Sequence, residues 1–326
     1  MNTNKLTLIL CLFVIFGTIS CENTDETNTN PNYNGLYDFY LYDVNTGVTT
    51  KITSSPDQTE HSYSFSPDSK KILYVNTNGI NEMNIDGSGN RVIISKGSGP
   101  SYSQDGKQIA FVDNGILYTI NIDGTNKIQM NDESIWLGFP VWSRDGENIV
   151  CSSENGLCIV SLTGNTKVFI SGNSADWYDW SYDSKEIYYS RFVSDNFAQI
   201  FKYNLIQDKE SQITDIDKYN YTPKANPVKN KIIFTSSLAD YGGDLVIIDA
   251  EGMDQNVILH KNQIITPYWS PDGERIVFVT EGLDLAIIDK DGSNYKKINE
   301  IPGACMEPKW SSDGKYIVYY RAVYFL

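Results

Sequence analysis

One short phrase recurs along the chain and constrains the fold more than any other feature. The phrase is an aromatic residue, serine, any residue, aspartate, and then glycine or serine. Complete copies occupy residues 65–69, 102–106, 142–146, 180–184, 269–273 and 310–314, and a degenerate copy lies at residues 224–227. With the serine position of the degenerate copy placed at Ala225, successive copies are 37 to 45 residues apart. A repeat of this length is typical of one blade of a β-propeller.

The residues between the copies follow an order that predicts four strands in each repeat. A β-branched or aromatic run follows each phrase, as at residues 71–75 and 275–279, and a second run comes after it. A tight turn then leads into a last short strand such as residues 91–94. The turns lie at Asp86-Gly87, Asp123-Gly124, Thr163-Gly164, Gln207-Asp208, Glu251-Gly252 and Asp291-Gly292. The pattern predicts an all-β chain of four-stranded antiparallel blades.

The order of phrases and turns also predicts how the ring closes. The first turn, at Gly47, precedes every aromatic-serine phrase and lies between strands expected at residues 39–42 and 48–52. After the last phrase there is room for one strand, at residues 315–320, and a short tail. Seven phrases and seven turns therefore predict a seven-bladed β-propeller. Strands from residues 36–53 would complete its last blade, which leaves fewer free sheet edges.

The N-terminal segment has the pattern of an export signal. Lys5 precedes an apolar run at residues 6–19 that is too short for a stable membrane span and fits a signal peptide. The segment 18–21, Thr-Ile-Ser-Cys, resembles the lipobox of bacterial lipoproteins, which implies a lipid on Cys21. Ordinary cleavage without lipidation is the alternative, because the segment also offers a small-x-small site.

These features divide the chain into three parts. Residues 1–20 are expected to be a signal peptide and residues 21–35 a lipidated, disordered tether, because Asn, Thr, Asp and Glu dominate that segment. Residues 36–326 form the predicted propeller. The chain is therefore expected to be exported and lipid-anchored to the bacterial cell envelope. Glu22, next to the cysteine, resembles a sorting signal for the outer membrane. The anchored protein would then face the periplasm or the cell surface.

The net charge excludes one class of partner. The chain has 41 acidic and 26 basic residues, which gives a formal net charge of -15. A field of this sign repels phosphate backbones and anionic lipid head groups. We therefore expect no nucleic-acid partner, and contact with a membrane only through the lipid anchor.

The sequence contains no motif that predicts a catalytic, metal or cofactor site. The chain has two histidines, His61 and His260, far apart in sequence, and no metal-ligating or phosphate-binding motif. The segment 289–294 resembles a calcium loop, but it occupies a position where every repeat has a turn. The aspartates of the phrase are expected to form turns, because equivalent positions in every repeat cannot all belong to one active site.

The sequence leaves open whether two cysteines of the mature chain form a disulfide. Cys151, Cys158 and Cys305 are an odd number, which argues against a disulfide framework. A type I′ turn at Asn155-Gly156 would place Cys158 opposite Ser153 rather than opposite Cys151. A disulfide between Cys151 and Cys158 would need a different register, and two separate half-buried thiols are the alternative.

The phrase, with the form aromatic-Ser-Pro-Asp-Gly at residues 269–273, resembles the repeat of TolB-type WD-repeat-like propellers over residues 36–326. The resemblance implies a non-enzymatic interaction module of the cell envelope with a protein partner. Similar blades also occur in prolyl peptidases and carbohydrate-active enzymes. No Gly-x-Ser-x-Gly elbow is present, so a serine peptidase is excluded. A glycan-binding or lyase-like propeller is the alternative, although two histidines fit a lyase's metal site poorly.

The connections of variable length are expected to share one face of the propeller, opposite the short turns. They are acidic and aromatic, and rigid aromatic side chains suit the recognition of proteins or sugars. The candidate residues of this binding face are Trp136, Phe139, Asp176, Trp177, Tyr178, Tyr219, Tyr221 and Glu307. Several of them would alternatively fill the central channel. The expected partner is an unidentified envelope protein or a glycan, bound by a monomer.

Overall fold

The computed structural model describes residues 37–54, 61–163, 165–170, 176–194, 197–215, 218–238, 243–280, 282–298 and 304–322. All of these residues belong to one compact unit, residues 34–323. Their regular structure consists of 27 β-strands. Within this part of the chain, no helix is long and apolar enough to cross a membrane. The predicted signal peptide and tether, with Cys21, lie outside the described residues.

Four of the sheets are four-stranded and are formed by consecutive antiparallel strands. The first contains β3 (His61–Phe65), β4 (Lys71–Asn76), β5 (Gly79–Asn84) and β6 (Arg91–Ile94). The second contains β7 (Ser98–Tyr102), β8 (Gln108–Asp113), β9 (Ile116–Asn121) and β10 (Ile128–Gln129). The third contains β11 (Leu137–Trp142), β12 (Asn148–Ser153), β13 (Gly156–Ser161) and β14 (Thr166–Ile170). The fourth contains β15 (Asp176–Trp180), β16 (Glu186–Ser194), β17 (Phe197–Asn204) and β18 (Lys209–Gln212).

The next sheet has seven strands because one long strand takes part in two sets of pairings. It contains β19 (Tyr219–Ala225), β20 (Lys231–Ser237), β21 (Gly243–Asp249), β22 (Asn256–Trp269), β23 (Arg275–Val279), β24 (Leu285–Asp289) and β25 (Lys296–Lys297). The first part of β22 pairs with β21, where Val257 lies opposite Val246. The last part pairs with β23, where Trp269 lies opposite Ile276.

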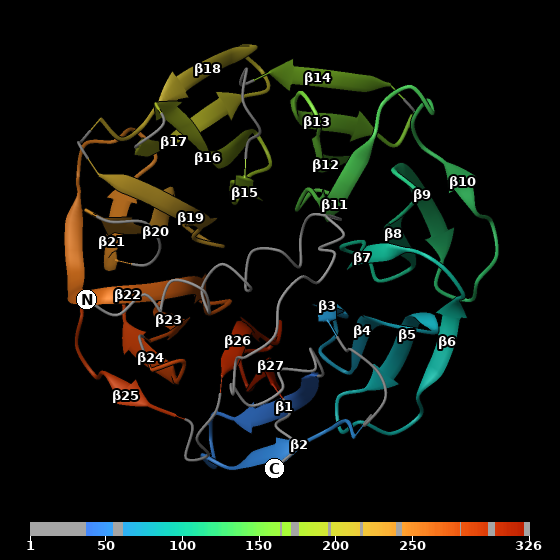
Figure 1. The fold of residues 1–326 in the computed structure, drawn as a ribbon, viewed down its shortest axis with the longest axis horizontal. Helices are drawn as coiled ribbons and strands as arrows, with labels where there is room; N and C mark the ends of the chain where they lie inside the picture. The colour runs from blue at the N-terminus through green and yellow to red at the C-terminus, as the bar shows by residue number, and fades with distance from the viewer. Residues whose placement is uncertain are drawn as a thin grey trace, which may run out of the picture. The chain divides into compact units, whose positions relative to one another are not determined.

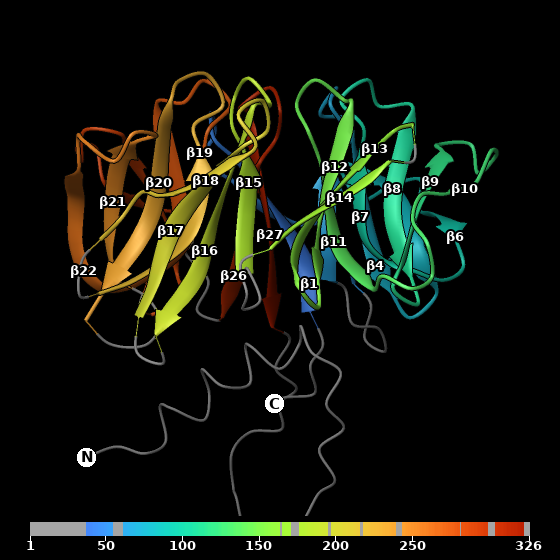
Figure 2. The same ribbon diagram turned by 90° about the horizontal axis from the view of Figure 1, so that it is seen from above.

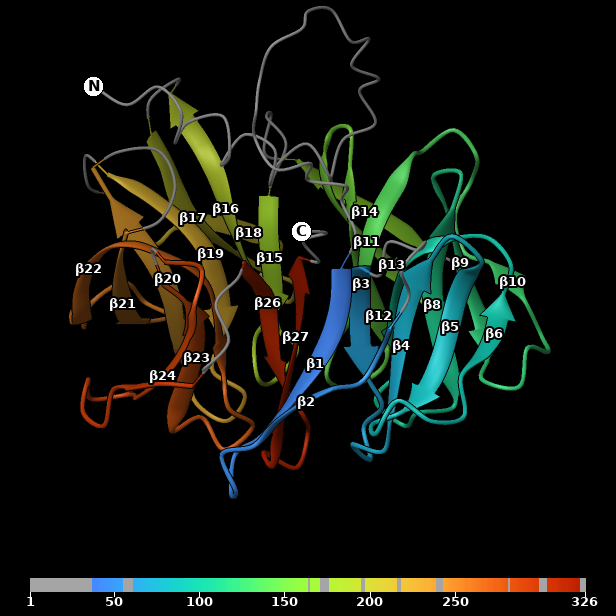
Figure 3. The same cartoon turned by 60° about the horizontal axis from the view of Figure 1, so that its bottom comes forward.

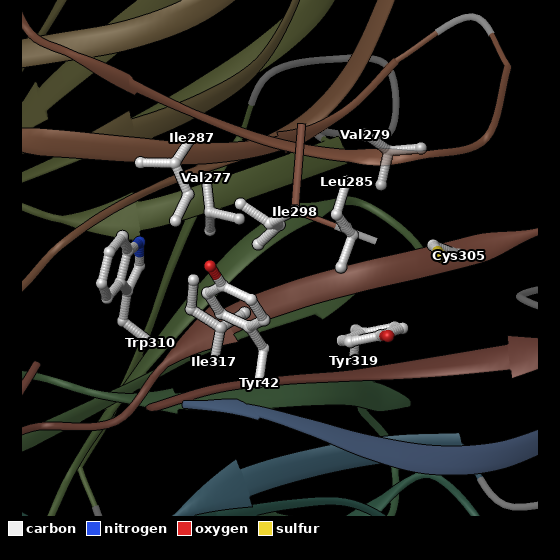
Figure 4. Close-up of a cluster of buried hydrophobic side chains, with 10 residues drawn as sticks. All are labelled: Tyr42, Val277, Val279, Leu285, Ile287, Ile298, Cys305, Trp310, Ile317 and Tyr319. Carbon is white, nitrogen blue, oxygen red and sulfur yellow. The ribbon is translucent and has the colours of Figure 1, made fainter. Parts of the chain in front are cut away.

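The last sheet joins strands from opposite ends of the described chain. It contains β1 (Tyr37–Asp43), β2 (Thr49–Lys51), β26 (Cys305–Trp310) and β27 (Tyr316–Ala322), in the order β2-β1-β27-β26. The register of β1 with β27 is continuous from Tyr37 opposite Ala322 to Asp43 opposite Tyr316. Tyr42 of β1 then packs among side chains of β23, β24, β26 and β27 (Figure 4). The strands predicted near residues 39–42 and 48–52 are confirmed in outline as β1 and β2, and β1 pairs with the C-terminal strand β27.

The sheets follow one another around a common centre, with β3, β7, β11, β15, β19 and β26 nearest to it (Figure 1). Figure 2 shows that strands such as β15 and β26 run from one end of this arrangement to the other. In Figure 3, β1 lies between β2 and β27. The fold is therefore an all-β propeller with four-stranded antiparallel blades, as predicted.

The aromatic-serine phrases form the turns that were predicted, and the bonds within them are local. Ser66 Oγ donates to the carboxylate of Asp68 at 2.7 Å and accepts the amide of Lys71 at 2.9 Å. Asp68 also accepts the amide of Lys70 at 3.1 Å. Because these bonds need only a few neighbouring residues, the same turn forms wherever the phrase occurs. We call the end of the innermost strands that carries these turns the phrase end, and the opposite end the start end.

The degenerate copy is displaced by one residue from its predicted position. The amide of Asn226 donates to the carbonyl of Lys231 at 2.8 Å, which is the bond that Ser66 makes to Lys71. Asn226 Oδ1 accepts the amide of Val228 at 3.0 Å, two residues on, whereas in a complete copy Asp68 accepts the amide of Lys70. The serine position is therefore Asn226 and not Ala225, because the backbone bond to Lys231 is kept.

The innermost strand of each unit carries the same irregularity. Four residues before the serine position, the register with the next strand shifts and a residue adopts a positive φ. These residues are Ser62, Gly99, Phe139, Trp177, Thr222, Thr266 and Glu307, with φ between 44° and 60°. A bulge with one residue in the left-handed region bends a strand and redirects its side chain. Three predicted binding-face residues, Phe139, Trp177 and Glu307, occupy this bulge position.

The hydrophobic core lies between neighbouring sheets. One cluster combines Val150 and Leu157 of the third sheet with Trp180 and Tyr189 of the fourth. The aromatic residue of the phrase also bonds across the gap, because Trp180 Nε1 donates to the carbonyl of Val141 at 3.0 Å. The aromatic residue of this phrase therefore packs between neighbouring sheets.

The predicted register around the cysteines is wrong. Cys158 lies directly opposite Cys151, and Ser153 lies opposite Gly156. The hairpin loop therefore consists of Glu154 and Asn155, one residue earlier than expected. Both cysteines are free and buried, and Cys305 is buried as well. Burial raises the pKa of the Cys158 thiol to about 11.

Candidate functional site

A cavity of about 230 Å³ lies where innermost strands of several sheets converge. Its walls come from β3, β7, β11 and β15 and from several phrases, including the one that follows β26. The polar side chains around it include Ser64, Ser101, Arg144, Asp179 and Ser312. Ser64, Ser101 and Asp179 each stand two residues before the serine of their phrase, so equivalent positions in several sheets face this centre. Arg144 and Ser312 belong to the phrases themselves, which places the cavity at the phrase end.

The same position, two residues before the serine, carries charged side chains in other sheets. Besides Asp179 in the fourth sheet, this position is occupied by Lys224 and Tyr268 in the seven-stranded sheet and by Lys309 in the last sheet. Burial by itself lowers the pKa of Lys224, but Tyr268, Asp179 and Glu307 act in the opposite direction and the pKa is raised. The Lys224 ammonium also lies 4.9 Å from the centre of the Tyr268 ring. Lys224 therefore stays charged between acidic and aromatic neighbours.

Sequence reasoning missed three cations at the centre, namely Arg144, Lys224 and Lys309. Lys309 Nζ donates to the carbonyl of Tyr63 at 2.7 Å and lies 4.5 Å from the centre of its ring. Although the chain has a net charge of -15, these three cations outnumber the carboxylates of Asp179 and Glu307 near them. The sequence could have revealed these cations through their positions in the repeat. Lys224 and Lys309 lie two residues before the serine position, and Arg144 lies one residue after it.

Part of the predicted binding face forms an aromatic patch, which we define as Trp177, Phe192, Phe197, Tyr219 and Tyr221. Tyr221 is 6% exposed and the other four rings are half-buried. Trp177 and Tyr219 each lie 5.6 Å from Tyr221 between ring centres, in edge and stacked arrangements. Phe192 lies 6.1 Å from Tyr221, and Phe197 lies 5.7 Å from Tyr219. The patch is at the start end, where β15, β17 and β19 begin and β16 ends.

Tyr178 is a buried part of the fold. It is 7% exposed, and its hydroxyl donates to the carbonyl of Phe139 at 2.6 Å. The same hydroxyl accepts the amide of Ser152 at 3.0 Å. Tyr63 makes a similar bond, because its hydroxyl lies 2.6 Å from the carbonyl of Glu307. In both cases a tyrosine hydroxyl donates a hydrogen bond to the carbonyl of a bulge residue in the neighbouring sheet.

Two candidate aromatic residues near β11 are exposed. Trp136 is 52% exposed and Phe139 is 40% exposed. The Trp136 ring lies against the backbone of Gly115, where an added Cβ would come within 2.0 Å of Trp136 Cδ1. Gly115, with a φ of 78°, is therefore the residue that makes room for this indole.

The remaining candidates differ in what the structure shows of them. Glu307 is half-buried at its bulge, and its carboxylate contributes, after burial, to holding the pKa of Tyr320 well above the ordinary value. Asp176 begins β15, and His61 begins β3, but the described structure includes only their backbones.

The described residues hold no group of three or more His, Cys, Asp or Glu side chains that could bind a metal ion. His260 Nδ1 lies 3.2 Å from the carboxylate of Asp244, and its side chain is 79% exposed. The calcium-like segment forms an ordinary turn, in which Asp291 accepts the amide of Ser293 at 2.9 Å.

Comparison of sequences gives limited information. No protein-family model matches the chain. An uncharacterized protein of Agrobacterium fabrum is 24% identical over 187 residues, a match that covers 52% of this chain and 62% of that protein. The matched part is thus less than two thirds of the relative, and the relative itself has no assigned activity.

Comparison of structures gives the fold. A protein from Agrobacterium tumefaciens, described provisionally as TolB, superimposes with a TM-score of 0.61 and 19% identity, over 89% of this chain and 99% of that chain. TolB from Acinetobacter baumannii superimposes with a TM-score of 0.53 and 15% identity, over 90% of this chain and 65% of that chain. The structural neighbours of the chain are TolB proteins, and its propeller fold is the one that they have.

Proposed function

We propose that the propeller has seven blades. In this interpretation the seven-stranded sheet is two blades, and β22 supplies the outer strand of one and the innermost strand of the next. The recurring bulge supports this count, because it occurs in β19 and again in the last part of β22, at Thr222 and Thr266. We propose further that the ring is closed by the N-terminal strands, which the pairing of β1 with β27 supports.

We infer that the protein is a non-enzymatic interaction module of the cell envelope that binds a protein partner. The observation that carries the proposal is the aromatic patch at the start end. Three half-buried rings pack against the buried Tyr221 and a fourth, Phe197, packs against Tyr219. Such rings offer large contact area at a small cost in conformational entropy. The TolB-like fold is consistent with this role, because TolB-type propellers are the family that the repeat resembles. We propose Trp136, Phe139 and Glu307 as further contacts of the same partner.

We propose that the protein acts as a monomer after export and carries a lipid on Cys21, which holds it at the outer membrane. The lipobox-like segment 18–21 supports this location. Labelling cells with a clickable palmitate analogue tests it. The label should enter the wild-type chain and be absent from Cys21→Ser, whereas equal labelling of both chains would contradict the assignment.

Affinity capture from detergent-solubilised native envelopes tests the partner. We expect the wild-type chain to retain one envelope protein that the double variant Trp177→Ala, Tyr219→Ala does not retain. Tyr182→Ala is the matched control, because Tyr182 is 43% exposed and lies in a phrase, at the opposite end of the innermost strands. The control should retain the partner.

Two results would contradict the proposal. Equal recovery with all three chains would place the partner elsewhere, and recovery of no protein would favour the glycan alternative. A glycan array with the same variants then decides, because binding that is lost in the double variant and kept in Tyr182→Ala would assign the patch to sugars.

A further inference from the structure

Arg144 stands out among the residues at the centre of the propeller because its charge is not balanced. Its side chain lines the cavity at the phrase end. The Nε atom is buried without a hydrogen-bond partner. Within the described part of the chain, no carboxylate lies within ion-pair distance of this guanidinium. A guanidinium has five donors, and a buried donor without a partner costs free energy.

Hydrogen bonds of the residues on either side of Arg144 fix the backbone of its turn. Ser143 Oγ donates to the carboxylate of Asp145 at 2.6 Å, and the amide of Asp145 donates to Ser184 Oγ, in the neighbouring sheet, at 3.0 Å. The corresponding residue of the other copies is uncharged, as with Gln104 and Ser312. The positive charge is thus a feature of this position in one sheet and not a requirement of the turn.

The one carboxylate in the cavity wall is occupied by other groups. Asp179 Oδ1 accepts the amide of Trp180 at 2.9 Å, and Oδ2 accepts the amide of Ala225 at 3.0 Å. Asp179 also contributes to the raised pKa of Lys224, which shows that these two charges interact. The charge of Asp179 is therefore opposed by Lys224 and two amides, and Arg144 remains uncompensated.

The size of the cavity limits what can enter. Its volume is about 230 Å³, which is below the roughly 300–1,000 Å³ of sites for drug-sized ligands and far above the ~10–15 Å³ that one water needs. The cavity reaches solvent, because Gln104 and Ser312 in its wall are exposed. It can therefore take a group of the size of one side chain or chain terminus, and not a run of sugars.

We propose that this cavity is a binding site for a single carboxylate group, which Arg144 holds through the edge formed by its two terminal Nη atoms, because Nε itself is covered by protein atoms. Two parallel N–H donors of this edge match the two oxygens of a carboxylate. Ser64 and Ser101, at equivalent positions in the wall, supply hydroxyl groups around the same space. The site is at the end opposite the aromatic patch, and it does not depend on the partner proposed for that patch.

Thermal unfolding of the full-length chain in the presence of small carboxylates tests the site. The probes are N-acetylglutamate α-amide, which presents a side-chain carboxylate, acetyl-triglycine, which presents a chain terminus, and inorganic phosphate, all against sodium chloride at equal ionic strength. A ligand that binds the folded chain raises Tm in proportion to ln(1 + [L]/Kd). We expect at least one carboxylate probe to raise Tm and its amidated analogue to have no effect.

Arg144→Gln identifies the group responsible. We expect this variant to bind the active carboxylate roughly 10- to 100-fold more weakly, because hydrogen bonds to a charged group are lost. Lys107→Gln is the matched control, since it removes the same charge from an exposed side chain in the phrase region of the neighbouring sheet. Its affinity should equal that of the wild type.

A second measurement uses the unaltered chain and does not depend on how the variant folds. Phenylglyoxal modifies accessible arginines, and mass spectrometry reports the modification at each one. The active probe should slow modification of Arg144 and leave Arg91, which pairs with Glu82 at 2.9 Å, unchanged. The proposal is overturned if no carboxylate raises Tm up to 10 mM, if phosphate alone acts, if Arg144→Gln binds as the wild type does, or if the probe does not protect Arg144.

Discussion

The hydroxyl of Tyr178 donates a hydrogen bond of 2.6 Å to the carbonyl oxygen of Phe139 in the neighbouring sheet. Phe139 is a bulge residue with a φ of 48°, so its carbonyl has left the regular ladder of its own sheet. The tyrosine therefore satisfies a backbone group that the bulge has released. The bond also links the innermost strands of two sheets at their start ends.

Removal of this hydroxyl should destabilise the fold. Tyr178→Phe leaves the carbonyl of Phe139 and the amide of Ser152 without their partner, and we expect the free energy of unfolding to fall by about 1–3 kcal/mol. Urea denaturation measures the change. Tyr182→Phe, at a tyrosine that is 43% exposed, should lie within ~0.5 kcal/mol of the wild type. Equal stability of both variants would show that the bond contributes nothing.

The N-terminal strand should be essential for stability. Phe39 is fully buried and packs against Tyr63, Tyr74 and Tyr320 at 5.2, 5.6 and 6.2 Å between ring centres. Phe39→Ala should cost about 3–5 kcal/mol, and deletion of residues 36–53 should unfold the last sheet. Val48→Ala, in the same segment but 57% exposed, is the control. An unchanged melting temperature in the deletion would refute closure of the ring by these strands.

The degenerate phrase should be as important to stability as the complete ones. Asn226 is 1% exposed, accepts the amide of Val228, and donates to the carbonyl of Gly273 at 3.0 Å. Asn226→Ala should lower the free energy of unfolding by about 1–3 kcal/mol, because a buried carbonyl and an amide lose their partner. The result is measured by urea denaturation against Val228→Ala, whose side chain is 50% exposed. A loss no larger than that of the control would mean that the two side-chain hydrogen bonds of Asn226 do not stabilise the fold.

The buried cysteines should be unreactive at neutral pH. Burial raises the pKa of Cys158 to about 11, and raises the pKa of Cys151 well above the ordinary value. Since only the thiolate reacts, iodoacetamide should label neither residue within minutes at pH 8 in the native chain, and both in 6 M guanidinium. Mass spectrometry of each cysteine peptide is the readout. Fast native labelling would contradict the burial, and absence of labelling after unfolding without reductant would reveal a disulfide.

The same shift predicts that stability falls in alkali. The pKa of Cys158 is higher in the folded chain than its ordinary value of 9.0, so folding favours the neutral thiol. Its contribution is complete below about pH 9 and is lost as the pH rises toward about 11. Unfolding in urea at pH 8.5, 9.5 and 10.5 should show a smaller loss for Cys158→Ala than for the wild type. Met253→Ala, 83% exposed, should keep the wild-type slope, and identical slopes in all three would contradict the shift.

The sequence predicted the fold well because the information is local. The bonds of Ser66 and Asp68 lie within one turn, and the recurrence of the phrase therefore indicates the recurrence of the turn. The same approach placed the degenerate copy one residue too early, because Asn226 and Val228 stand where the other copies have the serine and aspartate that mark the position. It also misjudged the hairpin near Cys158, where Glu154 and Asn155 form the loop.

The candidate site was predicted less completely, and the reason is geometric. Trp177 and Tyr219 were predicted as aromatic residues of the variable connections, whereas the structure places them at the start of β15 and β19 and brings them together around Tyr221. The cavity was not predicted. Arg144 and Asp179 are 35 residues apart in sequence, and only the convergence of separate sheets places both in one wall.

The position of β27 has a consequence for the order in which the chain can fold. This strand pairs on one side with β26 and on the other with β1, whose residues, Tyr37–Asp43, are among the first of the propeller to be synthesised. Until residues 316–322 exist, β1 has an open hydrogen-bonding edge and Phe39 lacks Tyr320, one of its partners. β1 can therefore pair with β27 only after β27 has been synthesised, and the sheet that contains both strands is completed last.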